Sequence, residues 1–190
     1  MSIVLASGSP RRKELLEMLG IKDMKIIPAK GEECAPENAP PGKLVETLAL
    51  QKAREVGALC SADDIVIAAD TIVWHENQVY GKPHSREQAI EMLECLSGNC
   101  HQVYTGIALI IKGREHTGYE MSRVYFRSLS HDEIARYVDT GEPMDKAGAY
   151  GAQGIGALFV RSIDGDFFNV MGLPLCRLGE MLKEQGVELL

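Results

Sequence analysis

Two strand-like segments follow one another in the middle of the chain and most limit its possible folds. Apolar and polar residues alternate with a period of two over residues 101–111, and a second such segment runs from about residue 115 to 127. Only Lys112-Gly113-Arg114 separates them, so the pattern predicts an antiparallel hairpin. Strand and helix patterns alternate on either side of it, which predicts a mixed sheet with flanking helices in an α/β fold.

Length and charge limit the possible functions further. A chain of 190 residues is long enough for one good core or for two small lobes, and we expect a single domain over residues 1–190. Its 20 basic residues against 27 acidic ones give a net charge of −7, which argues against binding a nucleic acid polymer. No apolar run approaches the roughly 20 residues of a membrane span, and no secretory signal opens the chain. We therefore expect a cytoplasmic protein without membrane contact.

The N-terminal segment has the pattern of a short strand, a loop of small residues and a helix. The apolar run of residues 3–6 breaks at Ser7-Gly8-Ser9, and a helix is expected from Pro10. Arg11, Arg12 and Lys13 stand in its first turn, where acidic residues are usual. Free N–H groups, hydroxyls and cations together suit a phosphate chain. The alternative is an ordinary helix start with a solvated basic turn.

An acidic residue follows the clearest buried strand pattern of the chain, residues 65–69. Asp70 stands directly after this apolar run, at the expected carboxyl end of the strand, where α/β folds place their chemistry. A cap or turn residue is the alternative, but Ile72-Val73-Trp74 continues the apolar run. A hairpin turn at residues 75–78 then returns the chain to Lys82, which we expect near Asp70.

Two further segments carry candidate side chains. Glu32 and Glu33 are paired carboxylates in a polar loop, and they predict either metal ligands or a solvated loop edge. Residues 145–156 hold four glycines within nine residues beside an acid, a cation and the amide Gln153, which favours a loop lying against a ligand. Together these features suit hydrolysis of a polyphosphate by activated water and a divalent ion.

Five blocks, in order and nearly end to end, make the chain resemble the Maf family of septum-formation-inhibitor-like nucleotide pyrophosphatases. The blocks are Leu5-Ala6-Ser7-Gly8-Ser9-Pro10-Arg11-Arg12, Ala69-Asp70-Thr71-Ile72-Val73, Gly81-Lys82-Pro83, Asp145-Lys146-Ala147-Gly148-Ala149-Tyr150-Gly151 and Val170-Met171-Gly172-Leu173-Pro174. The resemblance implies cleavage of a nucleoside triphosphate between its α and β phosphates with Mg²⁺ or Mn²⁺. It also implies a homodimer and an elongated α/β fold with two lobes around a deep cleft, similar to the inosine triphosphate pyrophosphatases.

The resemblance also implies roles for individual residues. Asp70 matches the family's catalytic proton acceptor and a metal ligand, and Glu33 matches a second metal ligand, with Glu32 as the alternative. The matching substrate-binding residues are Ser7, Arg11, Arg12, Lys52, Thr71, Lys82 and Gln153.

The family resemblance extends to the choice of base. Arg11, Thr71 and Gln153 look like the branch that acts on dTTP and UTP, and an amide can pair with O4 and N3–H of a pyrimidine. The competing hypothesis is a non-catalytic nucleotide sensor that regulates septum formation. A carboxylate in the site favours catalysis, because a pure anion sensor would avoid negative charge there.

Overall fold

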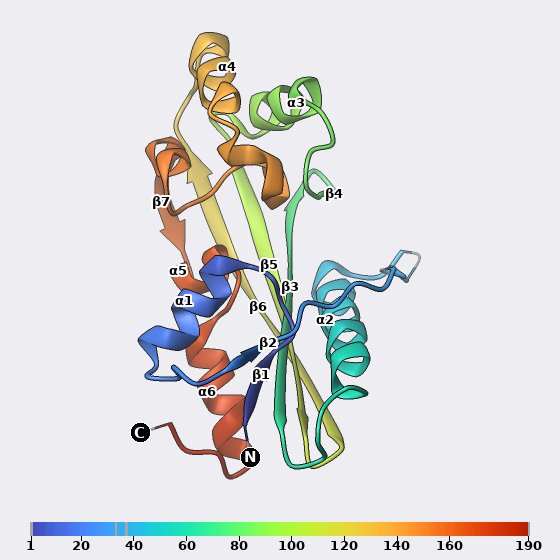
Figure 1. The fold of residues 1–190 in the computed structure, drawn as a ribbon. Helices are drawn as coiled ribbons and strands as arrows, with labels where there is room; N and C mark the ends of the chain where they lie inside the picture. Colours follow the sequence, from blue (N-terminus) through green and yellow to red (C-terminus); the bar gives the residue numbers. More distant parts are fainter. Residues whose placement is uncertain (1, 33, 37, 190) are drawn as a thin grey trace. The chain divides into compact units, whose positions relative to one another are not determined.

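The computed structural model (Figure 1) describes residues 2–32, 34–36 and 38–189. Seven described strands form one sheet in the order β2-β1-β3-β5-β6-β7, with β4 paired to β3. Strand β1 is parallel to β2 and β3, whereas the β3–β4 and β6–β7 pairs are antiparallel. The strands are β1 (Ile3–Leu5), β2 (Lys25–Ile26), β3 (Ile65–His75), β4 (Gln78–Tyr80), β5 (Cys100–Ile111), β6 (Arg114–Phe126) and β7 (Val160–Asp164). The predicted mixed α/β class is confirmed.

The helices lie between these strands along the chain. The α-helices are α1 (Pro10–Met18), α2 (Pro41–Gly57), α3 (Arg86–Leu96), α4 (His131–Asp139), α5 (Phe167–Met171) and α6 (Leu175–Glu184). Three short 3₁₀ helices follow α4, namely η1 (Glu142–Asp145), η2 (Ala147–Ala149) and η3 (Ile155–Phe159). Among the described residues, no helix combines the length and apolarity needed to cross a bilayer.

Two tight hairpins shape the sheet. Glu76 and Asn77 join β3 to β4 with φ angles of 48° and 61°, and Lys112 and Gly113 join β5 to β6 with φ angles of 50° and 74°. Two central residues with positive φ form the turn whose twist matches that of the flanking strands. Both predicted hairpins are confirmed.

The chain divides into two compact units. Unit 1 comprises residues 1–70, 105–120 and 172–190, and unit 2 comprises residues 71–104 and 121–171. Strands β3, β5 and β6 each contribute residues to both units. A single domain over residues 1–190 and two lobes around a cleft both stay predictions.

Unit 1 packs helices on both faces of its part of the sheet (Figure 1). Helix α2 packs against β1, β3 and β5. The buried residues at this contact are mostly small: Val4, Ala6, Ala49, Ala53, Val56, Val66, Ala68 and Ala108. The contact is so close that a Cβ on Gly106 would lie 2.2 Å from the carbonyl oxygen of Val45. Helices α1 and α6 lie on the other side. Small residues thus bring α2 against the strand that carries Asp70.

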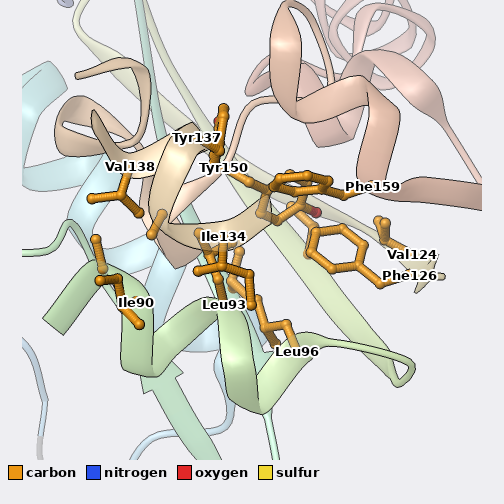
Figure 2. Packing of buried hydrophobic residues seen from close by; sticks show 14 residues of the cluster. Ile90, Leu93, Leu96, Val124, Phe126, Ile134, Tyr137, Val138, Tyr150 and Phe159 are labelled. Atoms are coloured by element: carbon orange, nitrogen blue, oxygen red, sulfur yellow. The ribbon is translucent and has the colours of Figure 1, made fainter. Parts of the chain in front are cut away.

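Unit 2 has a separate, aromatic core (Figure 2). Leu93 and Leu96 of α3 and Ile134 of α4 pack there with Phe126, Tyr137, Tyr150 and Phe159. The rings of Tyr137 and Phe159 meet edge to face, with centroids 4.8 Å apart. The sequence also predicts Ser85 as a helix cap and a capping box at Ser130-His131-Asp132-Glu133, and the structure has both, at the starts of α3 and α4.

Some sequence-based boundaries are wrong. Asp70 does not follow its strand but lies within it, because β3 continues to His75 and its last residues pair with β4. The sequence pattern also predicts a strand over residues 157–163 and a last helix to about residue 188, but residues 157–159 are 3₁₀ helix and α6 ends at Glu184. Helix α2 begins at Pro41, where a proline is tolerated because the first helical N–H has no partner.

Candidate functional site

The loop before α1 holds Ser7 against Arg12. Ser7 is buried, and its Oγ accepts hydrogen bonds from the Ser9 N–H at 3.2 Å and from Arg12 Nη1 at 3.1 Å. Arg12 Nε also donates to the carbonyl oxygen of Gly172 at 2.8 Å, which fixes the guanidinium. No acidic residue occupies the first turn of α1, where Arg11 is half-buried. A hydroxyl, guanidinium groups and a helix start therefore make this corner of unit 1 suited to an anion.

Asp70 and Lys52 form an ion pair in the same unit. Lys52 Nζ of α2 lies 2.5 Å from Asp70 Oδ1, and the two side chains are only 19% and 11% exposed. In the parallel β1–β3 pair, β1 ends at Leu5 opposite Ile67, so Asp70 extends beyond the carboxyl end of its neighbour. That position is where α/β sheets present functional groups, although the strand itself continues. The structure thus places a carboxylate in an apolar strand with the Lys52 amino group beside it.

Helix α2 also forms hydrogen bonds with the backbone of the acidic loop around Glu32, which the sequence predicts as a candidate metal-binding segment. Glu55 accepts hydrogen bonds from the N–H groups of Lys30 and Gly31 at 2.7 and 3.0 Å, and these bonds lower the pKa of Glu55. The Gln51 side chain binds both the N–H and the carbonyl oxygen of Cys34, at 3.1 and 2.8 Å. Gly31 and Cys34 are therefore both tied to α2.

A cavity of about 330 Å³ lies beside this segment. Its lining residues are Gly31, Glu32, Cys34, Gln51, Lys52 and Glu55. Glu32 thus shares a cavity with Lys52, the partner of Asp70, whereas Glu33 lies outside the described residues. The position of Glu32 keeps it as a candidate metal ligand.

The acids of the described residues do not form a metal cage by themselves. No group of three or more histidine, cysteine, aspartate or glutamate side chains in the described part of the chain is placed to hold a metal ion. Mg²⁺ usually takes one or two carboxylates and completes its shell with water and substrate phosphates. Asp70 and Glu32 are carboxylates of the type that such a metal takes, and their role as metal ligands stays a prediction.

The remaining predicted residues lie in unit 2. Thr71 follows Asp70 in β3, and Gln153 is exposed between η2 and η3. The carbonyl oxygen of Gly81 accepts a hydrogen bond from the Gly148 N–H at 3.0 Å, which ties the segment before Lys82 to η2. The proximity of Lys82 to Asp70 stays a prediction.

Lys146 is nearly buried in this unit. Its Nζ donates to the carbonyl oxygen of Glu142 and, at 2.7 Å, to Asp145 Oδ1. Gly148 approaches β3 so closely that a Cβ there would lie 2.8 Å from Val73 Cγ2. The glycines of residues 145–156 therefore serve close packing of this loop.

The sequence-based prediction missed four residues that each bind the backbone of a predicted site segment, namely Gln51, Glu55, Tyr137 and Glu142. One signal exists for the first two. They stand four residues apart on α2, so they share a helix face. Contacts of Tyr137 and Glu142 with the loop at residues 151–156 depend on tertiary packing and leave no local pattern.

Comparisons with solved structures agree with the fold. The structure of the Staphylococcus aureus Ham1 protein matches with a TM-score of 0.56 at 17% identity, covering 97% of this chain and 100% of that one. A HAM1 protein from Coxiella burnetii matches with a TM-score of 0.53 at 20% identity, covering 97% and 99%. At these identities the likeness shows a shared fold.

Comparisons of sequence are more specific. A protein called dTTP/UTP pyrophosphatase from Bacillus anthracis (strain CDC 684 / NRRL 3495) is 48% identical over 186 residues, covering 98% of this chain and 96% of the relative. One of the same name from Bacillus cereus (strain ATCC 10987 / NRS 248) is 47% identical, covering 98% and 91%. The family model described as Maf-like protein matches residues 2–185. The chain therefore belongs to the Maf-like protein family.

Proposed function

We propose that this protein hydrolyses dTTP and UTP to the nucleoside monophosphate and pyrophosphate. The observation that carries the reaction is the Asp70–Lys52 pair, a carboxylate kept inside a buried strand with a cation at 2.5 Å. The names of relatives at 47–48% identity support the substrates. The corner formed by Ser7 and Arg12 supports a phosphate-bearing ligand.

Asp70 serves as the general base in this proposal. Lys52 binds Oδ1 and orients the carboxylate, so that Oδ2 takes a proton from the attacking water. The water oxygen bonds to the α-phosphorus, and the bond from that phosphorus to the α–β bridging oxygen breaks. Pyrophosphate leaves, and Ser7, Arg11 and Arg12 neutralise charge on the phosphate chain.

A divalent cation, Mg²⁺ or Mn²⁺, fits the acids of unit 1. Asp70 would hold it together with Glu32 or Glu33. When bound, such an ion neutralises phosphate oxygens and polarises the phosphorus for attack.

Base selection is assigned to Arg11, Thr71 and Gln153, and Lys82 is assigned to substrate binding. The Gln153 amide offers a donor for O4 and an acceptor for N3–H of a uracil or thymine ring. A homodimer, a cytoplasmic location and a role in cell division arrest or in cleaning the nucleotide pool stay predictions.

A product assay tests the proposal. The protein is incubated with each common nucleoside triphosphate and with 7-methyl-GTP in Mg²⁺ or Mn²⁺, and phosphate products are separated. We expect pyrophosphate from dTTP and UTP and little from methylated GTP. Orthophosphate would mean γ-cleavage, and nucleotide binding without turnover would mean a sensor; either result would contradict the proposal.

A further inference from the structure

A short loop in unit 2, residues 151–156, carries Gln153 at its exposed tip. Gly151 and Gly156, at its two ends, are both buried. The ends touch, because a Cβ on Gly156 would lie 2.7 Å from the carbonyl oxygen of Gly151 and 3.0 Å from its nitrogen. The loop is thus closed at its base, and only a glycine fits at residue 156.

Tyr137 of α4 holds one end of this loop. Its phenolic oxygen accepts a hydrogen bond from the Gly151 N–H at 3.3 Å and donates to Glu142 Oε1 at 3.0 Å. The ring is buried in the aromatic core beside Phe159 (Figure 2). The hydroxyl therefore has a fixed position under the loop.

Glu142 holds the other end. Its Oε2 accepts a hydrogen bond from the Ile155 N–H at 2.9 Å, and its Oε1 accepts one from the Gly156 N–H at 3.1 Å. Burial opposes ionisation, but these two bonds, the Tyr137 hydroxyl and the charge of Lys146 lower the pKa of Glu142, so it stays a carboxylate.

The backbone next to Gln153 depends on this carboxylate. Gly154 has a φ of 113°, and a Cβ there would lie 2.9 Å from Glu142 Oε2. Glu142 therefore occupies the space that a side chain at residue 154 would need. One phenol and one carboxylate fix the backbone on both sides of Gln153.

We propose that Tyr137 and Glu142 are positioning residues that fix the backbone carrying Gln153 and thereby the choice of pyrimidine base. This inference rests on the proposed function, in which Gln153 contacts the base. Uracil presents O4 and N3–H, whereas cytosine presents an amino group and an acceptor N3, so the two exchange donor and acceptor. The Gln153 amide can distinguish the two bases only where the backbone places it at that edge of the ring, so selection of uracil over cytosine depends on a loop backbone held in one position.

Steady-state kinetics with UTP and CTP, which differ only at that edge of the base, test the inference. Tyr137→Phe keeps the buried ring and removes the hydroxyl, and Glu142→Gln keeps the side-chain shape and removes the charge. We expect kcat/KM for UTP to fall about tenfold, mainly through KM, with kcat within about threefold of wild type. The preference for UTP over CTP should fall by about the same tenfold factor.

Two variants of the same unit serve as controls. Tyr125→Phe removes the hydroxyl of an exposed tyrosine, and Glu91→Gln removes an exposed carboxylate on α3. Both should keep the wild-type ratio. Unchanged selectivity in folded Tyr137→Phe and Glu142→Gln proteins would overturn the inference while leaving the pyrophosphatase proposal intact.

Hydrogen exchange on the nucleotide-free protein gives a second readout. The amides of Ile155 and Gly156 should be protected in the wild type and exchange about tenfold faster in Glu142→Gln, because each loses a charge-assisted bond. Equal exchange would overturn the inference even if kinetics changed. A wild type that releases no pyrophosphate from any nucleotide would instead refute the proposed function, and exchange would still show whether the loop is held.

Discussion

Replacing Asp70 with asparagine tests the assigned base with the smallest change in shape. Asparagine keeps an oxygen that accepts from Lys52 Nζ, but the amide cannot take a proton from water at neutral pH. General-base catalysis contributes typically 10²–10⁴-fold, so kcat should fall by about that factor. A loss of about two to four decades corresponds to about 3–5 kcal/mol of transition-state stabilisation.

The same substitution also affects folding. The Lys52–Asp70 contact at 2.5 Å is a charge-assisted hydrogen bond between side chains only 19% and 11% exposed. Hydrogen bonds to charged groups contribute about 1.5–3 kcal/mol. Asp70→Asn keeps an acceptor for Lys52 but removes the carboxylate charge, so it should destabilise the fold by at most about 3 kcal/mol. For a chain of this size the melting temperature should fall by at most about 12 °C. Since native proteins have about 5–15 kcal/mol of stability, the variant stays folded in an assay at 25 °C.

Asp64 provides a matched control in the same unit. It is a buried aspartate whose carboxylate accepts hydrogen bonds from the N–H groups of Ser2 and Ser61, at 3.0 and 3.3 Å. Asp64→Asn should lose a similar amount of stability and keep the wild-type kcat. Pyrophosphate release from dTTP is measured beside thermal melts of all three proteins. Full activity of Asp70→Asn, or equal losses of kcat in both variants, would refute the assignment of Asp70 as the base.

Two further predictions concern the fold itself. Gly106→Ala should destabilise the protein by about 3 kcal/mol in urea titrations, because its Cβ would meet the Val45 backbone at 2.2 Å. Gly179→Ala in α6 has open space and should stabilise the protein by about 0.5–1 kcal/mol. A larger loss of stability in Gly179→Ala than in Gly106→Ala would contradict the close packing of α2 on the sheet. Burial lowers the pKa of His101, which bonds to Tyr150, to about 3. Since the unfolded chain takes up this proton near pH 6.5, stability should fall by about 1.4 kcal/mol per pH unit from 6.5 toward 3, and His101→Gln should remove this part of the acid sensitivity. Parallel stability–pH curves for wild type and His101→Gln would show that the reasoning fails.

Local pattern predicted most of the secondary structure. The alternation in residues 101–111 and the two short turns gave both hairpins, because a period of two places every second side chain on one face. Ser85 and Ser130 were predictable as helix caps, because capping involves residues three apart. The length of β3 could not be predicted from local pattern, since its second half depends on pairing with β4.

The candidate site also has residues that local sequence predicts and residues that only tertiary contacts reveal. Ser7 and Arg12 stand five residues apart across a helix start, so the sequence alone pointed to both as candidate phosphate-binding residues; their mutual contact came from the structure. Asp70 was a candidate from its place after an apolar run, whereas Lys52 was implied only by family resemblance, because a lysine in mid-helix is usually a solvated residue. No pattern predicted that the two would pair. Gln51, Glu55, Tyr137 and Glu142 bind backbone groups 13 to 25 residues away. Gln51 and Glu55 share a helix face, which is a weak signal, and Tyr137 and Glu142 had none.

The sequence by itself determined the order of strands and helices, the mixed fold class and the basic, hydroxyl-rich turn at residues 7–12. Periodicity, caps and turns depend on interactions over a few residues, so they can be predicted from the sequence alone. Tertiary structure alone decided that Asp70 lies within a continuing strand with Lys52 against it, and that Tyr137 and Glu142 close the loop of Gln153. Those contacts depend on how α2 and α4 pack in their cores, which many distant residues set together.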